Sequence, residues 1–297
     1  MAKLLSQEQF KIISKFRLDN RAGKEGFMTD VYGNIIATKF HSHLDGFGGR
    51  VLELTKESDE VLHETTEYFA VAYALDLAKT DDFVAIELGA GYGPWIARSG
   101  VLAKRKGIKK VTLVGVEADK EKFTWMRENL NNNGLVTDKK TTINLDLYNS
   151  AVSAGEKELF FPVLDNSSAD YGAKASKLSE EKDYRGMALK TVRIPAIPLK
   201  EIMDKYQKID IIYIDIQGAE ESVIQSVVQY LNKKVKLIAI GTHNRQIEGN
   251  LLDIFFSNKW DLILESPCDF KYDLNKPSLT GMTINDGFQF WKNTSLN

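Results

Sequence analysis

Acidic residues and glycines gather where two short apolar runs of the sequence end. The run that starts at Phe83 leads into Glu87-Leu88-Gly89-Ala90-Gly91-Tyr92-Gly93, and the next run ends in Glu117-Ala118-Asp119. Glycines let a backbone turn sharply and approach a ligand closely. Their Gly-x-Gly-x-Gly spacing differs from the Gly-x-Gly-x-x-Gly that seats a dinucleotide pyrophosphate. A helix that packs closely on its strand would also use such glycines, so the turn alone does not establish a binding site.

The charges around the glycine turn favour a cationic ligand. The carboxylate of Glu87 would repel phosphates and attract an ammonium or a sulfonium. Glu117 stands at a strand tip, where an acid can accept both hydroxyls of a ribose, and Asp119 is placed to cap the next helix. The combination predicts S-adenosylmethionine as the cofactor rather than NAD. The residues expected at this cofactor are Glu87, Gly89, Ala90, Gly91, Gly93, Glu117 and Ala118.

Two further apolar runs end in residues that could transfer a proton. One ends in Asp215-Ile-Gln217-Gly218-Ala219-Glu220, and the other is followed by His243. His243 titrates near neutral pH and is the best candidate for a base that removes a proton from an acceptor hydroxyl. Asp215 would project over the pocket, where it would contact the cofactor and orient that histidine or the hydroxyl. Glu220 completes the candidate catalytic set, although the helix dipole also favours a carboxylate there for structural reasons.

A divalent cation is an alternative source of acidity for the hydroxyl. Asp215, His243 and Asn244 would stand at neighbouring strand ends and could ligate one metal ion. Three ligands chosen from a single sequence form a weak pattern. The preferred interpretation therefore has no metal ion.

From Phe83 onward, strand-like runs alternate with helix-like runs, and this alternation predicts a mainly parallel sheet with helices on both faces. The expected strands are Phe83–Leu88, Lys110–Glu117, Thr142–Tyr148, Ile209–Asp215, Val235–Ile240, Trp260–Glu265 and Gly287–Trp291, with an extra one at Glu158–Pro162. The expected helices start at Pro94 and cover Lys120–Asn131, Ala219–Leu231 and Ile247–Asn258. Ligands of such sheets bind at the carboxyl ends of the strands, where the acids and glycines lie.

The region before this alternation predicts a small α+β appendage. A helix over residues 1–20 and short strands near 32–39 and 50–54 place the appendage at 1–58 and the main domain at 59–297, whose first helix covers 59–79. A glycine-rich loop with His41 and His43 lies between the short strands. The polar segment Asp165–Tyr184 is the expected acceptor-recognition loop, in which Tyr171 could stack on a sugar ring.

The composition limits the classes of partner that we expect for this chain. The chain has 297 residues, a formal net charge of −2 and one cysteine. No basic field favours nucleic acid, no segment is apolar enough for a membrane span or a signal peptide, and one cysteine allows no internal disulfide. We therefore expect a cytoplasmic protein with a small-molecule or glycan partner. Homo-oligomers remain open, since the first helix could pack on its own domain or on a second subunit.

Several of these motifs together resemble one known family. Asp215-Ile-Gln-Gly-Ala-Glu220, with Glu87-Leu-Gly-Ala-Gly, Val-Glu117-Ala-Asp and Asn149-Ser150-Ala151-Val-Ser153, is similar to the FkbM-type methyltransferases, as are Val192–Leu199 and Ile240–His243. The resemblance runs from Phe83 to the C-terminus. The family's usual Asp-x-Glu-Gly-x-Glu has Gln217 here at its middle acid, and Tyr213 replaces a common lysine.

The resemblance implies a class I methyltransferase fold, Rossmann-like with a mainly parallel seven-stranded sheet, and O-methylation of a sugar or polyketide-type product. It also implies that Asn149, Ser150 and Ala151 border the adenine. Two other functions stay open. One is a non-catalytic protein that binds S-adenosylmethionine, since Gln217 departs from the family's motif. The other is an NAD-linked oxidoreductase, against which the glycine spacing argues.

Overall fold

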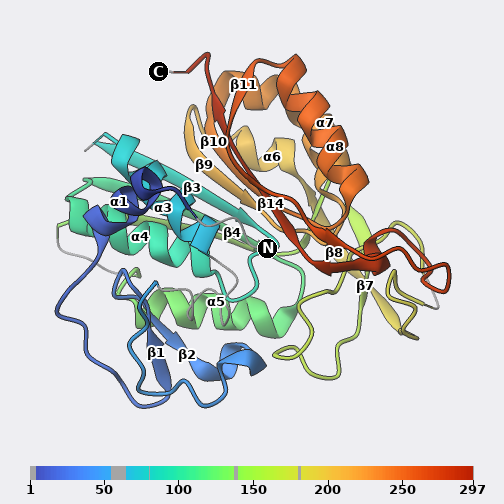
Figure 1. Ribbon diagram of the computed structural model, residues 1–297, viewed down its shortest axis with the longest axis horizontal. Coiled ribbons are helices and arrows are strands. Elements are labelled where there is room, and N and C mark those ends of the chain that lie inside the picture. The colour runs from blue at the N-terminus through green and yellow to red at the C-terminus, as the bar shows by residue number, and fades with distance from the viewer. Residues whose placement is uncertain (1–4, 55–64, 80, 137–139, 180–181, 297) are drawn as a thin grey trace.

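The computed structural model describes residues 5–54, 65–79, 81–136, 140–179 and 182–296. In this part of the chain the largest sheet has seven strands, which cross the middle of the molecule (Figure 1). Their order is β11 (Trp260–Ser266), β14 (Gly287–Asn293), β10 (Val235–Thr242), β9 (Ile209–Ile214), β3 (Asp82–Leu88), β4 (Lys110–Glu117) and β5 (Thr142–Asn149).

The strand directions locate a crevice in this sheet. Strands β10, β9, β3, β4 and β5 are parallel, whereas β14 runs antiparallel to both β10 and β11. The chain leaves β3 toward β4 on one side and reaches β9 on the other side much later. Such a reversal of strand order opens a crevice at the carboxyl ends of the strands, between the loops that follow β3 and β9.

Helices cover both faces of the sheet because successive strand residues point to opposite faces. Phe83 and Ala85 belong to one apolar core, and Val84 and Ile86 belong to the other. The first core includes residues of α3 (Thr65–Leu77), α4 (Pro94–Lys106) and α5 (Lys120–Asn132). The second includes residues of α6 (Leu199–Met203), α7 (Glu220–Lys234) and α8 (Arg245–Ser257). The predicted alternation and the mainly parallel sheet are confirmed.

The N-terminal segment differs from the sequence prediction. Helix α1 (Gln7–Phe16) is shorter than expected because Ser6 and Gln9 form a capping box that starts it there. Strand β1 (Phe27–Thr29), which was not predicted, pairs with β2 (Ile35–Ala37). The strand expected at 50–54 is wrong, because Val51 makes only an isolated bridge. Two short 3-10 helices follow β2, namely η1 (Thr38–Phe40) and η2 (Ser42–Leu44). The expected start of a helix at residue 59 lies outside the described residues.

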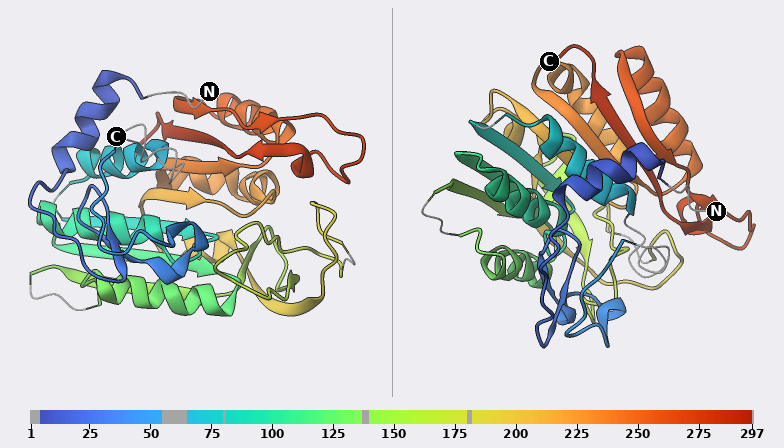
Figure 2. Two further views of the ribbon diagram at one scale, coloured as in Figure 1. Left: turned by 60° about the horizontal axis from the view of Figure 1, so that its bottom comes forward. Right: turned by 60° about the vertical axis from the view of Figure 1, so that its left-hand side comes forward.

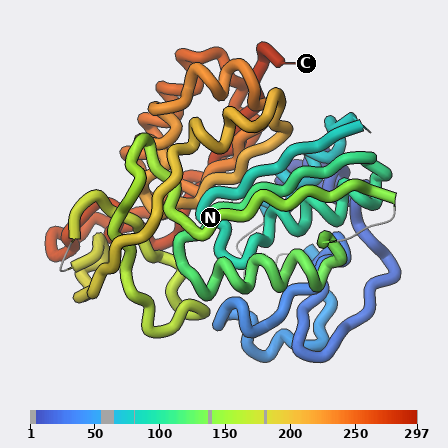
Figure 3. The backbone as a smooth tube through the Cα atoms, turned by 180° about the vertical axis from the view of Figure 1, so that it is seen from behind, coloured from blue at the N-terminus to red at the C-terminus, as the bar shows by residue number. Residues whose placement is uncertain are grey.

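The N-terminal segment packs on the rest of the chain at two places. Helix α1 lies on α3, where Lys15 pairs with Asp76 at 2.8 Å. Strand β2 lies beside α5, as the blue segment in Figure 3 shows. There the side chain of Asn133 accepts from the amide of Ile35 at 2.9 Å and donates to its carbonyl at 3.0 Å.

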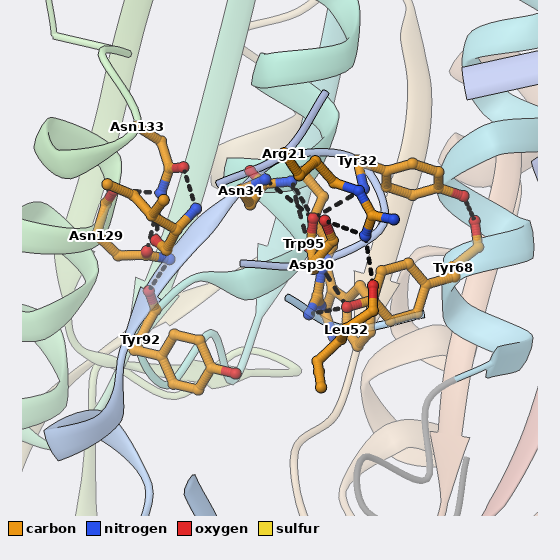
Figure 4. A network of polar contacts seen from close by, with 12 residues as sticks. Arg21, Asp30, Tyr32, Asn34, Leu52, Tyr68, Tyr92, Trp95, Asn129 and Asn133 are labelled. Carbon is orange, nitrogen blue, oxygen red and sulfur yellow. Dashed lines mark hydrogen bonds and ion pairs between the residues drawn. The ribbon is translucent and has the colours of Figure 1, made fainter. Parts of the chain in front are cut away.

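A buried ion pair joins this segment to helix α4. The guanidinium of Arg98 lies 2.8 Å from Asp30, and their side chains are 1% and 0% exposed. Arg98 also donates to the Tyr68 hydroxyl at 2.7 Å, and the Tyr32 hydroxyl donates to the Tyr68 carbonyl at 2.6 Å. Figure 4 shows Asp30, Tyr32 and Tyr68 in this network. Because a buried charge needs its partner, the network holds the N-terminal segment in one position on α4.

Two smaller β structures lie at one end of the main sheet. One has the strands β6 (Ala151–Ser153), β8 (Thr191–Pro198) and β7 (Glu158–Pro162), in that order. The other pairs β12 (Asp269–Phe270) with β13 (Thr283–Asn285), beside the 3-10 helix η3 (Thr280–Met282). Figure 2 shows the loops of both structures at the same end of the molecule. None of the described helices combines the length and the apolarity that crossing a bilayer requires.

The variant Arg98→Met tests the buried ion pair. It leaves Asp30 as an uncompensated buried charge, so we expect the free energy of unfolding to fall by about 3–5 kcal/mol in a denaturant titration. Arg193→Met is the matched control, because the Arg193–Glu158 pair is 70% and 65% exposed and such pairs contribute about 1 kcal/mol or less. Equal losses in the two variants would contradict the role given to Asp30 and Arg98.

Candidate functional site

The glycine turn after β3 lets two loops pass very close to each other. Gly89 has φ +74°, and a Cβ on it would lie 1.8 Å from the carbonyl oxygen of Asp215. No other residue type fits there without moving the main chain. The turn therefore brings the end of β3 against the loop after β9, and the two together form the floor of the crevice.

Glu87 has a different role from the one expected. Its carboxylate accepts from the amide of Ile96 at 2.9 Å and from that of Trp95 at 3.3 Å. Both amides belong to the first turn of α4, where N–H groups lack partners within the helix. Glu87 therefore caps α4 from the end of β3, and its carboxylate is not part of the pocket lining.

Glu117 lies in the crevice as predicted and is held by two backbone amides. One oxygen accepts from the amide of Gly91 and the other from that of Asp119, each at 2.7 Å. Burial raises the pKa of Glu117, although Lys122 and these amides oppose the rise. Asp119 caps α5 as expected, since its side chain accepts from the amide of Lys122 at 2.8 Å. Each carboxylate oxygen of Glu117 retains a second lone pair that could accept from a ligand hydroxyl.

A cavity of about 320 Å³ lies over the glycine turn, and we call it the glycine pocket. This size is within the usual range for ligand pockets. Seven of the residues expected at the cofactor line it, namely Gly89, Gly91, Glu117, Ala118, Ser150, Ala151 and Asp215. Ala90, Gly93 and Asn149 do not. Asn149 instead donates its side-chain amide to the carbonyls of Glu117 and Ala118 at 3.0 and 3.2 Å, which joins the ends of β4 and β5.

Lys122 is a pocket residue that the sequence prediction missed. It lines the glycine pocket, is 4% exposed, and donates to the carbonyl of Asp170 at 2.6 Å. Its ammonium lies 4.1 Å from the centre of the Tyr171 ring. Burial lowers the pKa of Lys122, and Glu117 and Asp119 oppose that shift. A lysine in the first turn of an amphipathic helix is usually solvated, so no signal in the sequence indicates that this one points inward.

A second cavity of about 330 Å³ adjoins the first, and we call it the histidine pocket. Gly89, Tyr171, Asp215 and Gln217 line both pockets, whereas His243 and Asp286 line only the second. Asp215 and His243, which the sequence placed at neighbouring strand ends, therefore lie in the same pocket. Asp286, the residue before β14, was missed because no motif surrounds it.

His243 lies among three carboxylates in this pocket. Its Nδ1 is 3.0 Å from Glu220, and its Nε2 is 3.1 Å from Asp215 and 3.9 Å from Asp286. The side chain is 2% exposed, and neither ring nitrogen makes an aligned hydrogen bond to a described residue. Burial by itself lowers the pKa of His243, but Glu220 and Asp215 together raise it well above its usual value. The histidine is thus a buried group with high proton affinity, and its Nε2 is on the side of Asp215 and Asp286.

Glu220 is tied to the loop before its own helix. Its Oε1 accepts from the amides of Ile216 and Gly218 at 3.1 and 3.0 Å. The side chain is fully buried, so these bonds set the position of the carboxylate beside Nδ1 of His243. Glu220 can therefore hold a proton on Nδ1 and leave Nε2 to exchange a proton with a ligand.

A metal ion could be held by a set that differs from the expected one. The donor atoms of Asp215, Glu220 and His243 all lie within 4.8 Å of one another. Asn244 is not in this set, because its side chain caps α8 by accepting from the amide of Ile247 at 2.8 Å and donates to the Thr280 hydroxyl. Glu220 and Asp215 also approach different nitrogens of the imidazole, and one ion can bind only one of these nitrogens.

The loop with His41 packs against the segment with Tyr171, a residue that lines both pockets. The two rings stack with centroids 4.4 Å apart, and the amide of Ser42 donates to the carbonyl of Ser168 at 2.9 Å. Tyr171 contacts His41 and Lys122, so its ring is part of the pocket wall rather than a free platform for a sugar. Burial lowers the pKa of His41 to about 4, and His41 is therefore neutral at physiological pH. Arg50 lies on the Phe47 ring and does not line either pocket.

The sequence matches a known protein family and a relative. Residues 87–272 match the family described as the methyltransferase FkbM domain. A protein of Jannaschia sp. (strain CCS1) named "Putative methyltransferase" is 28% identical over 222 residues, which are 73% of this chain and 75% of that protein.

Two solved structures show weaker likeness. Methyltransferase FkbM from Methylobacillus flagellatus KT has 13% identity and a TM-score of 0.41 over 77% of this chain and 55% of its own. Precorrin-6y C5,15-methyltransferase from Geobacter metallireducens GS-15 has 12% identity and a TM-score of 0.39 over 75% of this chain and 86% of its own.

The seven-stranded sheet with its reversed β14 and the glycine turn define an S-adenosylmethionine-dependent methyltransferase of the Rossmann-like class I. The family match covers more than half of the sequence. The chain belongs to the FkbM methyltransferase family.

The variant Gly89→Ala tests the close approach of the two loops. The added methyl group would meet the Asp215 carbonyl at 1.8 Å, so we expect a loss of about 3 kcal/mol in the free energy of unfolding and weaker ligand binding. Gly107→Ala is the matched control, because Gly107 has φ +78° but open space around it. There we expect about 1 kcal/mol from backbone strain alone. Equal losses in denaturant titrations would show that the contact with Asp215 is unimportant.

Proposed function

We propose that this protein transfers a methyl group from S-adenosylmethionine to a hydroxyl of a small molecule or a glycan. The observation that carries the proposal is the position of His243, whose imidazole lines a pocket that shares Gly89, Asp215 and Gln217 with the glycine pocket. A base and a nucleoside-sized cavity are thus adjacent. Membership of the FkbM family supports methyl transfer as the reaction.

The glycine pocket fits the donor. A buried carboxylate at the tip of β4 suits the ribose hydroxyls, and Gly89 and Gly91 leave room for close approach of a ligand. Ser150 and Ala151, which follow β5 in the chain, would border the adenine. Asp215 is where the two pockets meet, so its carboxylate would face the positive end of the donor. When bound there, S-adenosylmethionine supplies a methyl group that its sulfonium already activates.

His243 and the carboxylates around it would take up the proton that the acceptor hydroxyl loses. An acceptor hydroxyl that hydrogen-bonds to Nε2 loses its proton to this nitrogen as its oxygen bonds to the methyl carbon, and the C–S electron pair stays on sulfur. Glu220 stabilises the resulting imidazolium through Nδ1, and Asp215 does so beside Nε2. Alignment of the acceptor supplies much of the rate, since the donor needs no further activation.

Ligand binding separates this proposal from the two alternatives. Isothermal titration with S-adenosylmethionine and with NAD should give binding of the first and none of the second. A radiolabelled methyl assay on a panel of sugars, polyols and phenols then separates an enzyme from a non-catalytic binding protein. Binding of NAD alone would support an oxidoreductase instead.

The variant His243→Ala tests the base. We expect kcat to fall by about 100-fold to 10,000-fold because proton removal loses its acceptor. The dissociation constant of S-adenosylmethionine should change little, since His243 lines only the histidine pocket. An unchanged kcat would contradict the assignment. The activity of the unmodified protein is also measured in a chelator such as EDTA. If this activity vanishes and returns with Mg²⁺ or Mn²⁺, a metal ion rather than His243 activates the hydroxyl.

The pH dependence of the reaction provides a separate test. A base must be neutral to accept a proton, and the pKa of His243 is raised by Glu220 and Asp215 against the effect of burial. We therefore expect kcat/KM to rise with pH through and above neutrality. Asp215→Asn removes one of the two carboxylates, so the rising limb should move to lower pH whatever the maximal rate. Asp253→Asn, on the exposed face of α8, is the control. A profile that is already flat above pH 6 would contradict the raised pKa.

A further inference from the structure

The two pockets differ in the charge that their described lining residues carry. Lys122, Lys174 and Lys177 line the glycine pocket, and the carboxylates of Glu117, Glu156 and Asp215 balance them in number. In the histidine pocket the permanent cation among the described lining residues is Arg185. The carboxylates there are Asp215 and Asp286, whose side chains are 57% and 61% exposed. Negative charge is therefore available to a ligand on the histidine side.

Arg185 does not compensate this charge, because two other carboxylates already bind its guanidinium. Asp170 accepts from both terminal nitrogens at 2.9 and 3.1 Å, and Asp183 accepts from Nε at 2.6 Å. Such bidentate pairing is strong and leaves little net charge for a ligand. Asp215 and Asp286 would repel an acceptor that carries a phosphate or a carboxylate.

Of the two carboxylates, Asp286 is the one that would face only the acceptor and not the donor. Asp215 lines both pockets and accepts from the side-chain amide of Gln217 at 3.0 Å, whereas Asp286 lines only the histidine pocket. Partial burial, with Asp215 and Glu220 nearby, raises the pKa of Asp286, and His243 opposes this shift. Burial is the largest cause of this rise, and the negative charges of Asp215 and Glu220 add to it.

A second, independent feature marks where the acceptor sits. Nε2 of His243 is buried and belongs to the lining of the same pocket, and although Asp215 lies 3.1 Å from it, the two make no aligned hydrogen bond. It lies 3.9 Å from Oδ2 of Asp286. A hydroxyl on Nε2 and a donor group on Oδ2, each at about 2.8 Å, fit this separation when they are on neighbouring carbon atoms of one ligand.

We propose that the methyl acceptor is a 1,2-amino alcohol, such as an amino sugar, whose hydroxyl binds Nε2 of His243 while its protonated amine binds Asp286. The inference rests on the proposed function and specifies its substrate class. An ammonium suits this position better than a metal ion, because Asp215 already accepts a hydrogen bond from Gln217 and because the carboxylates approach both nitrogens of His243.

Equilibrium binding to the protein saturated with S-adenosylhomocysteine tests this proposal without turnover. The probes are the methyl glycosides of glucosamine, N-acetylglucosamine and glucose. They share a ring and differ in the group at one carbon, and only the glucosamine glycoside carries a charge there. We expect the glucosamine glycoside to bind about tenfold more tightly than the other two, the usual effect of one hydrogen bond to a charged group. Asp286→Asn should abolish this preference, and Asp253→Asn, which removes an equal charge away from both pockets, should keep it.

Each other outcome has a definite meaning. Equal binding of the three glycosides, or a preference that survives Asp286→Asn, overturns the amine proposal. Tight Mn²⁺ binding that is lost in Asp286→Asn also overturns it, because Asp215 and Asp286 would then bind a metal ion. If the amine preference is found but no S-adenosylhomocysteine binds, the proposed function fails while the amine site stands. Circular dichroism of Asp286→Asn confirms that the variant is folded.

Discussion

The site depends on the close approach of the main chain at Gly89 to the carbonyl of Asp215. A Cβ at Gly89 would lie 1.8 Å from this oxygen, so only glycine allows the end of β3 and the loop after β9 to meet. The floor of the crevice, the position of the Asp215 carboxylate and the boundary between the two pockets all follow from that contact. The capping of α4 by Glu87 fixes the other end of the same turn.

The loop after β9 also fixes the positions of the charges that surround His243. Glu220 holds its position because the amides of Ile216 and Gly218, in the loop after β9, bind its carboxylate. The loop therefore places Asp215 on one side of the imidazole and Glu220 on the other. Burial disfavours a charged imidazole, and the two carboxylates more than offset this effect. When it is neutral, a histidine in such a position is a strong proton acceptor, which suits a base that removes the proton of a hydroxyl.

The sequence predicted the sheet and the strand-end residues well, because both follow from local patterns. Buried parallel strands are apolar runs, and their carboxyl ends meet at one edge, so Glu117, Asp215 and His243 could be brought together without a structure. Side-chain direction could not be predicted. Glu87 points to α4 and Lys122 points into the pocket, and in each case the direction depends on neighbours distant in sequence. Asp286 was missed for the same reason, since β14 reaches the site only through its antiparallel pairing with β10.

Gln217 shows how a departure from the family's motif fits this environment. Its φ is +55°, an uncommon conformation for a residue with a side chain, and its side-chain amide donates to Asp215 while its oxygen accepts from the Tyr184 hydroxyl at 3.3 Å. A glutamate here would place a further carboxylate beside Asp215, Glu220 and Asp286. The neutral amide instead binds Asp215 as a donor and links it to the segment that carries Arg185. The substitution thus keeps the loop in place, and it leaves the negative charge of the histidine pocket to Asp215 and Asp286.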